Sequence, residues 1–329
     1  MKKIIAEKIN GNFFKKDIIS IDQFNTQDIN ILFKKARQLE KNIDSSKPND
    51  ILKGKIVTLL FYEPSSRTFG SFASAAQRLG GGIIPIQNPA SVSSVAKGET
   101  LEDTIKTFQS LSECIIIRNP IKGNALKAAQ AAFLIPVINA GDGIGEHPTQ
   151  ALLDMYTLYK KFKGLNNLTG VIAGDLLNGR TVHSLLKGLS LYKNNTIYLL
   201  SPKQLKLTSV DLEEFKENGL NLIEITSEKE IPKNADFWYW TRVQKERFED
   251  LKEYEKVKNS FIINKEFLRQ YGNPKMIILH PLPRISEITT DIDTDVRAIY
   301  FKEEIRNGLY IRTALLSLVL GNKKSYGKK

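Results

Sequence analysis

The sequence predicts an α/β protein with two doubly wound parallel-sheet domains and an active-site cleft between them. Short apolar runs rich in β-branched and aromatic residues alternate with helix-length segments along most of the 329 residues. Polar clusters directly follow several of these runs, and a chain of this length gives a prior of about two domains. Ligands of such sheets bind at the carboxyl ends of the strands, so function is sought there.

The first half contains four predicted strands and three predicted helices. The strands cover 56–62, 83–86, 114–118 and 136–139, and the helices cover about 67–79, 100–111 and 124–132. The run I-V-T-L-L-F-Y at 56–62 is typical of a buried strand. Three glycines at 80–82 close the first helix.

The second half repeats the alternation. Its predicted strands are 171–174, 196–200, 221–226, 236–240 and 276–279, with crossover helices at 180–192 and 209–218. A helix over 149–162 joins the halves, and an amphipathic segment at 305–320 is predicted to dock as a helix. We expect one domain of residues 1–148 plus 304–329 and a second domain of residues 149–303.

Composition narrows the class of protein. The net charge is +12, but the lysines are scattered and no recognised nucleic-acid motif accompanies them, which favours a solvated basic surface over nucleic-acid binding. One cysteine, Cys114, forbids an intramolecular disulfide and fits a reducing compartment. No apolar run approaches the ~18 residues of a membrane span. We expect a cytoplasmic protein.

The segment P-S-S-R-T-F-G-S, directly after the first strand, predicts a phosphate site. Ser65 and Ser66 offer hydroxyl groups at a helix N-cap, and Arg67 and Thr68 open the helix. Hydroxyls, a guanidinium and free helix N–H groups converge on one anion at such a junction. The alternative is an ordinary capped helix with a surface arginine.

Polar residues also end two later strands of the first half. Strand 114–118 ends in Arg118, and strand 136–139 leads through a glycine-rich turn to His147 and Gln150, which share one helix face. His147 can donate to a carbonyl oxygen, and Gln150 can bond to an amide. The alternative is a helix capped by Thr149 with incidental neighbours.

The strand ends of the second half carry a similar set. Arg180 follows the first strand, and Arg242 and Gln244 follow strand 236–240. The last strand ends in H-P-L-P-R at 280–284, where one X-Pro bond could be cis and aim main-chain carbonyls into the cleft. His183 stands alone, which favours a structural histidine.

Four arginines therefore lie at separate strand ends, and Lys97 in the hydroxyl-rich loop S-V-S-S-V-A-K-G-E can join them. Arginine binds phosphate and carboxylate with two parallel hydrogen bonds, so this is a site for polyanionic ligands. No residue set has metal-ligand spacing, and no Ser-His-Asp motif stands out. The chemistry is predicted to rest on positioning and electrostatics.

These motifs resemble those of the aspartate carbamoyltransferase family over nearly the whole chain. They include F-Y-E-P-S-S-R-T, K-G-E-T-L-E-D-T, N-A-G-D-G-I-G-E-H-P-T-Q-A-L-L-D, G-R-T-V-H-S-L, T-R-V-Q-K-E-R-F and H-P-L-P-R, in family order. Ornithine enzymes of the same superfamily typically carry H-C-L-P and an S-M-G loop. Here Pro281 replaces the cysteine and no S-M-G occurs. The resemblance implies transfer of the carbamoyl group of carbamoyl phosphate to L-aspartate in pyrimidine biosynthesis.

The resemblance also implies roles for single residues. Catalysis falls to Thr68, Arg118, His147 and Lys97. The carbamoyl phosphate site is Ser65, Ser66, Arg67, Thr68, Arg118, His147, Gln150, Leu282 and Pro283, with the backbone around Pro281. The aspartate site is Lys97, Arg180, Arg242 and Gln244.

It further implies a homotrimer with shared active sites, in which Ser93 and Lys97 come from the neighbouring subunit, and to which regulatory chains can attach. Glu63 and Arg247 are implied interdomain contacts, and no cofactor or metal is implied. The chain departs from the better-known bacterial pattern at Phe69, Ala96 and Leu177.

Three alternatives accompany this interpretation. One is a carbamoyltransferase for another amino acid, such as ornithine. Another is a nucleotide-dependent oxidoreductase, suggested by the sheet pattern and by Gly141, Gly143 and Gly145. The dinucleotide fingerprint is G-x-G-x-x-G, and here the third glycine falls one residue early. The third is a basic scaffold that binds nucleic acid, or a degenerate homologue, against which the intact set of cleft residues argues.

Overall fold

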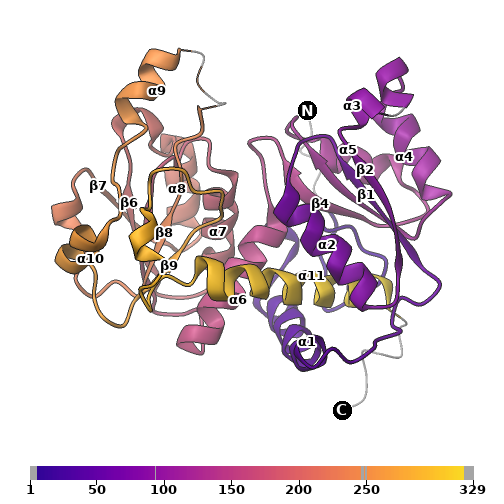
Figure 1. Cartoon of the computed structure of the whole chain (residues 1–329), viewed down its shortest axis with the longest axis horizontal. Coiled ribbons are helices and arrows are strands. Elements are labelled where there is room, and N and C mark those ends of the chain that lie inside the picture. The colour runs from indigo at the N-terminus through magenta and orange to yellow at the C-terminus, as the bar shows by residue number, and fades with distance from the viewer. Residues whose placement is uncertain (1–5, 93, 246–247, 249, 322–329) are drawn as a thin grey trace. The chain divides into compact units, whose positions relative to one another are not determined.

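The computed structural model describes residues 6–321 except 93, 246, 247 and 249, and without the side chains of Ala90 and Val92. The chain divides into two compact units (Figure 1). Unit 1 comprises Met1–Leu153 and Asn307–Lys329, and unit 2 comprises Asp154–Arg306. The predicted domain limits, 1–148 plus 304–329 and 149–303, stay a prediction.

Unit 1 is built on a four-stranded parallel sheet. Its strands are β1 (Ile56–Phe61), β2 (Gly82–Gln87), β3 (Cys114–Asn119) and β4 (Val137–Asp142), in the order β2-β1-β3-β4. The strand order reverses between β1 and β3, because the chain moves outward to β2 and then returns to the other side of β1. The carboxyl ends at this reversal are where a doubly wound sheet binds ligands.

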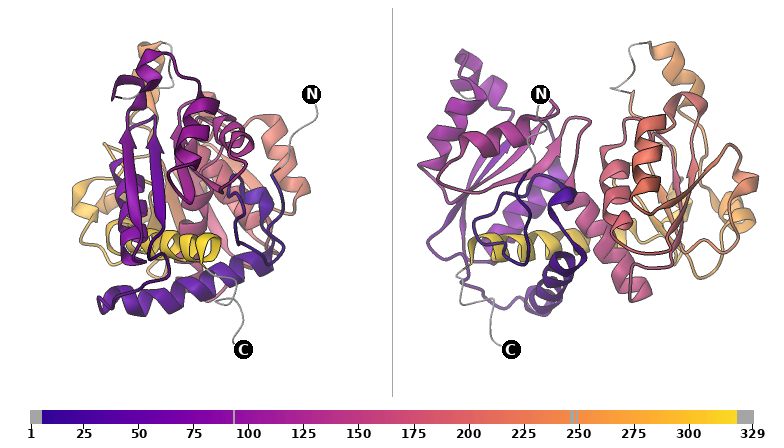
Figure 2. Two further views of the ribbon diagram at one scale, coloured as in Figure 1. Left: turned by 90° about the vertical axis from the view of Figure 1, so that its right-hand side faces the viewer. Right: turned by 180° about the vertical axis from the view of Figure 1, so that it is seen from behind.

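Helices lie on both sides of this sheet (Figure 2). They are α1 (Thr26–Asp44), α2 (Ser66–Arg78), α3 (Pro89–Val92), α4 (Leu101–Gln109), α5 (Asn124–Ala131), most of α11 (Ile305–Leu320) and the start of α6 (Pro148–Phe162). Helices α4 and α5 cover one face, where Ile105 and Ala128 pack with Leu60, Ile115 and Ile117. No prediction covered α1.

The segment before α1 extends the sheet beyond β4. Ile18 forms a parallel bridge with Ile138: the Ile18 N–H donates to the Val137 carbonyl at 2.9 Å, and the Asn139 N–H donates to the Ile18 carbonyl at 2.8 Å. The buried Gln23 side chain accepts from the Ile19 N–H at 2.6 Å. The amino-terminal segment is therefore fixed beside the strand that leads into the glycine-rich turn.

Unit 2 contains a five-stranded parallel sheet. Its strands are β5 (Thr169–Ala173), β6 (Thr196–Leu200), β7 (Asn221–Ile225), β8 (Phe237–Trp240) and β9 (Ile277–Leu279), in the order β7-β6-β5-β8-β9. Its helices are the rest of α6, α7 (Arg180–Ser190), α8 (Ser209–Glu217), α9 (Leu251–Val257) and α10 (Lys265–Tyr271). Trp238 and Trp240 pack edge to face on Phe267 in its core. The order reverses between β5 and β8.

The predicted fold class is confirmed, and all nine predicted strands are present. The segment S-V-S-S-V-A-K-G-E at 91–99, predicted as a loop, instead includes the end of α3 and a 3-10 turn at Ser94–Lys97. Both are too short to show a helical period in the sequence. Among the described helices, none is long and apolar enough to cross a membrane.

We predict that Gly174→Ala destabilises unit 2. Gly174 has φ +110°, and a Cβ there would lie 2.1 Å from the Thr241 carbonyl oxygen, so both the backbone and the packing must yield. The expected loss is about 2 kcal/mol of unfolding free energy. Both tryptophans lie in unit 2, so denaturant unfolding followed by tryptophan fluorescence reports on it.

Gly164→Ala is the matched control, because a methyl group added at Gly164 would meet nothing within 4 Å and its φ is not positive. Equal stability of the two variants would contradict the packing inferred for Gly174.

Candidate active site

Arg118 lies at the strand-order reversal of unit 1. It pairs with Phe61 in the β1–β3 register, and its main-chain carbonyl accepts from the Tyr62 N–H at 2.8 Å. Its guanidinium lies 2.7 Å from a carboxylate oxygen of Glu63 and donates to the Ala140 carbonyl at 3.2 Å. The side chain is only 11% exposed. The loop after β1 and strand β4 therefore hold this guanidinium at the carboxyl edge of the sheet.

The amino end of α2 lies at the same edge. The helix begins at Ser66, one residue earlier than predicted, and Ser65 is the N-cap. Contrary to the expectation of a side-chain cap, the Ser65 hydroxyl makes no cap hydrogen bond to the described helix. Thr68 is buried in the first turn, whereas Arg67 is exposed. The first-turn N–H groups keep the character of an anion site.

Phe69 takes part in packing. Its ring lies edge to face on the buried Phe61 ring, with centroids 5.3 Å apart. One turn on, the buried Arg312 of α11 donates to the Ser71 hydroxyl at 3.1 Å and lies over the Phe72 ring. These contacts fix the position of α2 just after its amino end. Phe69, where the chain departs from the better-known bacterial pattern, therefore has a structural role.

The glycine-rich turn after β4 is tied to the loop after β3. The Asp142 carboxylate accepts from the Gly123 N–H at 2.9 Å and the Ala125 N–H at 3.2 Å, at the start of α5. The Gly143 N–H donates to the Asn119 carbonyl at 2.8 Å. Gly143 has φ +55°, and a Cβ there would lie 2.6 Å from the main-chain nitrogen of Lys122. The close approach of these two loops therefore requires glycine.

Glu146 anchors the end of this turn to the amino-terminal segment. Its carboxylate accepts from the Ser20 hydroxyl at 2.7 Å and from the Ile21 N–H at 3.0 Å. Asn139 bridges the same elements, because its amide donates to the carbonyls of Ile19 and Glu146. Sequence analysis missed both residues. The acid directly before His147 was a signal, but its partner lies 126 residues away.

His147 and Gln150 follow at the start of α6, and both are at most 9% exposed. The Gln150 N–H donates to the His147 carbonyl at 2.9 Å, so the two residues are spaced by one helical turn. The structure thus places Thr68, Arg118, His147 and Gln150 in segments that leave one sheet edge, as the sequence predicted.

Lys97 ends the 3-10 turn after β2, and its side chain is exposed, as is Ala96 beside it. Ser93 and Arg247, both predicted site residues, lie outside the described residues.

In unit 2 the strand-order reversal lies between β5 and β8. The Thr241 N–H donates to the Ala173 carbonyl at 2.8 Å, and the Asp175 N–H donates to the Thr241 hydroxyl at 3.2 Å. The residues after β5 and after β8 are therefore joined directly beyond the strands.

Asp175 joins these two segments further and was missed by the sequence analysis. Its fully buried carboxylate accepts from the main-chain N–H groups of Asn178 and Gln244, and the Gln244 side chain donates to the Asn178 carbonyl at 3.2 Å. Burial outweighs these hydrogen bonds and raises the pKa of Asp175 above its ordinary value. The network brings the half-buried Arg180, first residue of α7, to the same loops as Arg242 and Gln244.

His183 and Leu177 lie outside this network. The His183 Nε2 bonds to the Leu176 carbonyl at 2.8 Å, and the ring lies beside Phe215, which gives it a structural partner. Leu177 is 37% exposed.

The H-P-L-P-R turn follows β9. The Leu282–Pro283 bond is cis, which confirms the expectation that one X-Pro bond there is cis, and Leu282 has φ +50°. Pro281 and Leu282 are half-buried, and Pro283 is exposed.

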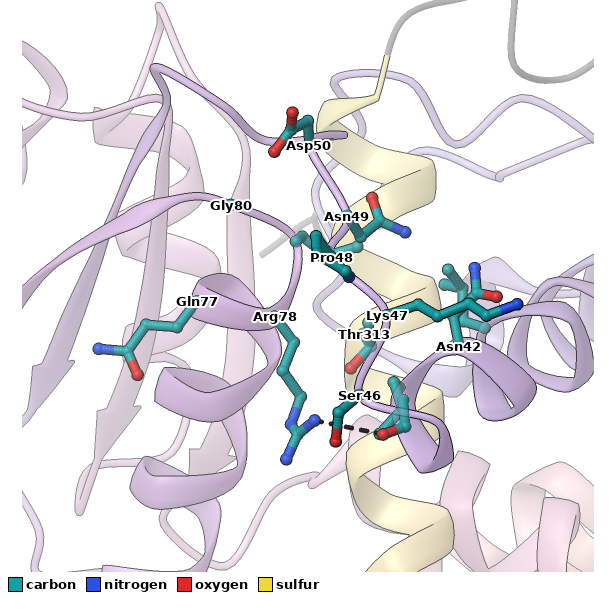
Figure 3. Close-up of a pocket in the computed structure, with 13 residues that line it drawn as sticks. Asn42, Ser46, Lys47, Pro48, Asn49, Asp50, Gln77, Arg78, Gly80 and Thr313 are labelled. Carbon is teal, nitrogen blue, oxygen red and sulfur yellow. Dashed lines mark hydrogen bonds between the residues drawn. The ribbon is translucent and has the colours of Figure 1, made fainter.

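A separate cavity of about 300 Å³ lies in unit 1 (Figure 3). Asn42, Arg78 and Thr313 are among the residues that line it, and Arg78 donates to the Ile43 carbonyl at 3.5 Å. Its lining includes residues 46–50, ahead of β1, and Gly80, ahead of β2. It therefore lies at the amino ends of the strands, whereas Arg118 lies at the carboxyl ends.

The two sets of residues suit different ligands. In unit 1, a helix amino end, hydroxyls, a guanidinium and an imidazole suit a phosphate next to a carbonyl oxygen. In unit 2, two guanidinium groups and an amide suit carboxylates. Among the described residues, no group of three His, Cys, Asp or Glu side chains could hold a metal ion.

Two family models match successive parts of the chain. Residues 16–160 match the carbamoyl-P binding domain of aspartate/ornithine carbamoyltransferase, and residues 166–319 match its Asp/Orn binding domain. The chain belongs to the aspartate/ornithine carbamoyltransferase family.

Several of the relatives that it matches are named aspartate carbamoyltransferases. It is 45% identical over 93% of its length to the aspartate carbamoyltransferase catalytic subunit of Thermococcus kodakarensis, of which 97% is covered. It is also 45% identical to a stretch of the multifunctional protein pyr1-3 of Dictyostelium discoideum; 93% of this chain matches 14% of that protein.

Among solved structures, it resembles aspartate transcarbamoylase from Trypanosoma cruzi in complex with carbamoyl phosphate and aspartate. The TM-score is 0.87 at 38% identity, covering 94% of this chain and 98% of that one. Of the two substrate classes in the family, the chain thus groups with the aspartate enzymes.

Proposed function

We propose that unit 1 of this aspartate carbamoyltransferase supplies most contacts to carbamoyl phosphate and unit 2 supplies most contacts to L-aspartate. The reaction joins carbamoyl phosphate and L-aspartate to give N-carbamoyl-L-aspartate and phosphate, a step of pyrimidine biosynthesis. The observation that carries the division is that each sheet presents arginines where its own strand order reverses: Arg118 in unit 1, and Arg180 with Arg242 in unit 2. The likeness to the carbamoyl phosphate and aspartate complex supports it.

In unit 1, the proposed phosphate site is the amino end of α2. Ser65, Ser66, Arg67 and Thr68 supply hydroxyl groups, a guanidinium and first-turn N–H groups to the phosphate oxygens. The carbamoyl nitrogen is assigned to Gln150 and to the main-chain carbonyls around Leu282 and Pro283 of unit 2, to which it donates hydrogen bonds.

Catalysis then consists of stabilising an oxyanion. The aspartate amine attacks the carbamoyl carbon and forms a C–N bond, and negative charge develops on the carbonyl oxygen. Thr68, Arg118 and His147 donate to that oxygen. The intermediate collapses by breaking the C–O bond to phosphate, and the departing phosphate takes the proton of the amine.

In unit 2, Arg180, Arg242 and Gln244 bind the two carboxylates of aspartate, with Lys97 joining them. The hydrogen bonds through Asp175 set the spacing of the two loops that carry these side chains. Two guanidinium groups suit a dicarboxylate, whereas the cationic side chain of ornithine is repelled.

An assay of carbamoyl phosphate with each amino acid tests the substrate. We expect turnover of L-aspartate and none of ornithine. Turnover of ornithine without turnover of aspartate would contradict the proposal.

We predict that Arg242→Ala and Arg118→Ala fail differently. Arg242→Ala should raise KM for aspartate by about 100-fold while the Kd of carbamoyl phosphate changes little, because only a carboxylate contact is lost. Arg118→Ala should lower kcat by about 100-fold or more, because charge is removed from the developing oxyanion. Steady-state kinetics measures KM and kcat, and calorimetric titration measures the Kd of carbamoyl phosphate. Equal losses of affinity for aspartate and for carbamoyl phosphate in Arg242→Ala would refute the proposed division between the units.

We also propose a cytoplasmic homotrimer with shared active sites, to which regulatory chains can attach. Ser93 and Lys97 are assigned to the neighbouring subunit's site, and the exposure of Lys97 supports this. Glu63 and Arg247 are proposed to make the interdomain contacts that close the cleft on its ligands.

Subunit mixing tests the shared site. Lys97→Ala and Arg118→Ala trimers should each be nearly inactive. Refolded together in equal amounts, they should recover about a quarter of the wild-type activity, since about one site in four receives both intact residues. Sedimentation analysis, with and without a bisubstrate analogue, should give the mass of three chains. No recovery on mixing would place Lys97 in its own subunit's site.

A further inference from the structure

The H-P-L-P-R turn is held in place by buried acids that no proposed substrate contact uses. The His280 N–H donates to Glu304 Oε2 at 2.9 Å, and both residues are 2% exposed. Glu304 ends a π-helical turn, Tyr300–Glu304, ahead of α11. Such turns are rare and frequently occur at functional sites. The first main-chain group of the turn is thereby fixed to the end of a helical element.

The His280 ring fixes the rest of the turn. The Leu282 N–H donates to Nδ1 at 2.8 Å, so Nδ1 is an acceptor and the ring proton lies on Nε2. Nε2 then donates to Glu287 Oε1 at 2.8 Å. Burial alone raises the pKa of Glu287, but its hydrogen bonds from His280 and the Ile285 N–H outweigh that effect and hold the pKa below its ordinary value. Glu287 is therefore the ionised acid of this turn.

Glu304 has a second carboxyl beside it, that of Asp154. Asp154 is fully buried, bonds to the Glu304 side chain and accepts from the Tyr239 hydroxyl at 3.0 Å. Burial raises the pKa of Glu304 well above its ordinary value, and the charge of Asp154 adds to this. Two adjacent buried carboxyls cannot both be ionised, so the pair holds a proton.

The neighbours of the pair decide where that proton lies. The Tyr239 hydroxyl donates to Asp154, which favours the ionised form of Asp154. Glu304 Oε1 is buried, and no donor among the described residues reaches it. A proton on Oε1, donated to Asp154, satisfies both oxygens of Glu304, since Oε2 accepts from His280.

We infer that Glu304 is a positioning residue: protonated and bonded to Asp154, it fixes the main chain of the turn whose carbonyls around Leu282 and Pro283 are assigned to the carbamoyl nitrogen. The inference rests on the proposed function for the role of those carbonyls. The bonds that Glu304 itself makes lie within unit 2.

The test compares Glu304→Gln with Glu304→Leu. Glutamine keeps an oxygen for the His280 N–H and an amide hydrogen for Asp154, so the Kd of carbamoyl phosphate and kcat should stay within about twofold of the wild type. Leucine keeps the size and loses both bonds, so this Kd should rise about tenfold while the KM for aspartate changes much less. Glu303→Leu is the matched control, because Glu303 is adjacent to Glu304 and exposed. The affinity of this variant for carbamoyl phosphate should equal that of the wild type.

Infrared difference spectroscopy reads the proton directly. The wild type minus Glu304→Gln should show the carbonyl stretch of a protonated, buried carboxyl, and this holds even if the leucine variant does not fold. Loss of affinity in Glu304→Gln, unchanged affinity in Glu304→Leu, or absence of the carboxyl band would overturn the inference. A wild-type chain that bound carbamoyl phosphate without carbamoylating aspartate would refute the proposed function and leave the infrared result to stand on its own.

Discussion

Parallel strand direction is the constraint on which the rest of this structure depends. In each unit all strands run the same way, so every loop that leaves a strand emerges at one edge. Reversal of the strand order separates two neighbouring loops at that edge. Arg118 marks this place in unit 1, and the Thr241–Asp175 contact marks it in unit 2. Gly143 and Gly174, both at positive φ, let the chain turn at these edges.

Buried and half-buried acids fix the loops that carry the basic residues. Asp142, Glu146, Asp175 and Glu287 each accept hydrogen bonds from main-chain N–H groups, and each joins a loop at a strand end to another segment. A carboxylate that receives such bonds repays its desolvation without relying on a surface cation. Although the net charge is +12, these acids bond to the main chain of the loops and fix its conformation. Glu304 differs, since its bonds require it to keep its proton.

The amino-terminal segment shows how a site depends on elements that carry no chemistry. Ile18 extends the sheet beside β4, and Ser20 and Ile21 hold Glu146, the residue before His147. Helix α2 of the same unit is held in a similar way, because Phe69 packs on Phe61 and Arg312 donates to the Ser71 hydroxyl. The reactive groups of unit 1 are therefore positioned by contacts that are distant in sequence.

The sequence by itself determined the strands and the fold class and singled out the arginines at strand ends, because these features are local: a run such as 56–62 is apolar, and Arg67, Arg118, Arg180 and Arg242 each end or follow such a run. Strand order and side-chain partners are not local. Glu146 meets Ser20 across 126 residues, Tyr239 meets Asp154 across 85, and His280 meets Glu304 across 24. A carboxylate looks the same in sequence whether it faces water, a main-chain N–H or another acid. Only the tertiary structure decided which acids hold the loops and which one keeps a proton, because burial and neighbouring charges set those outcomes.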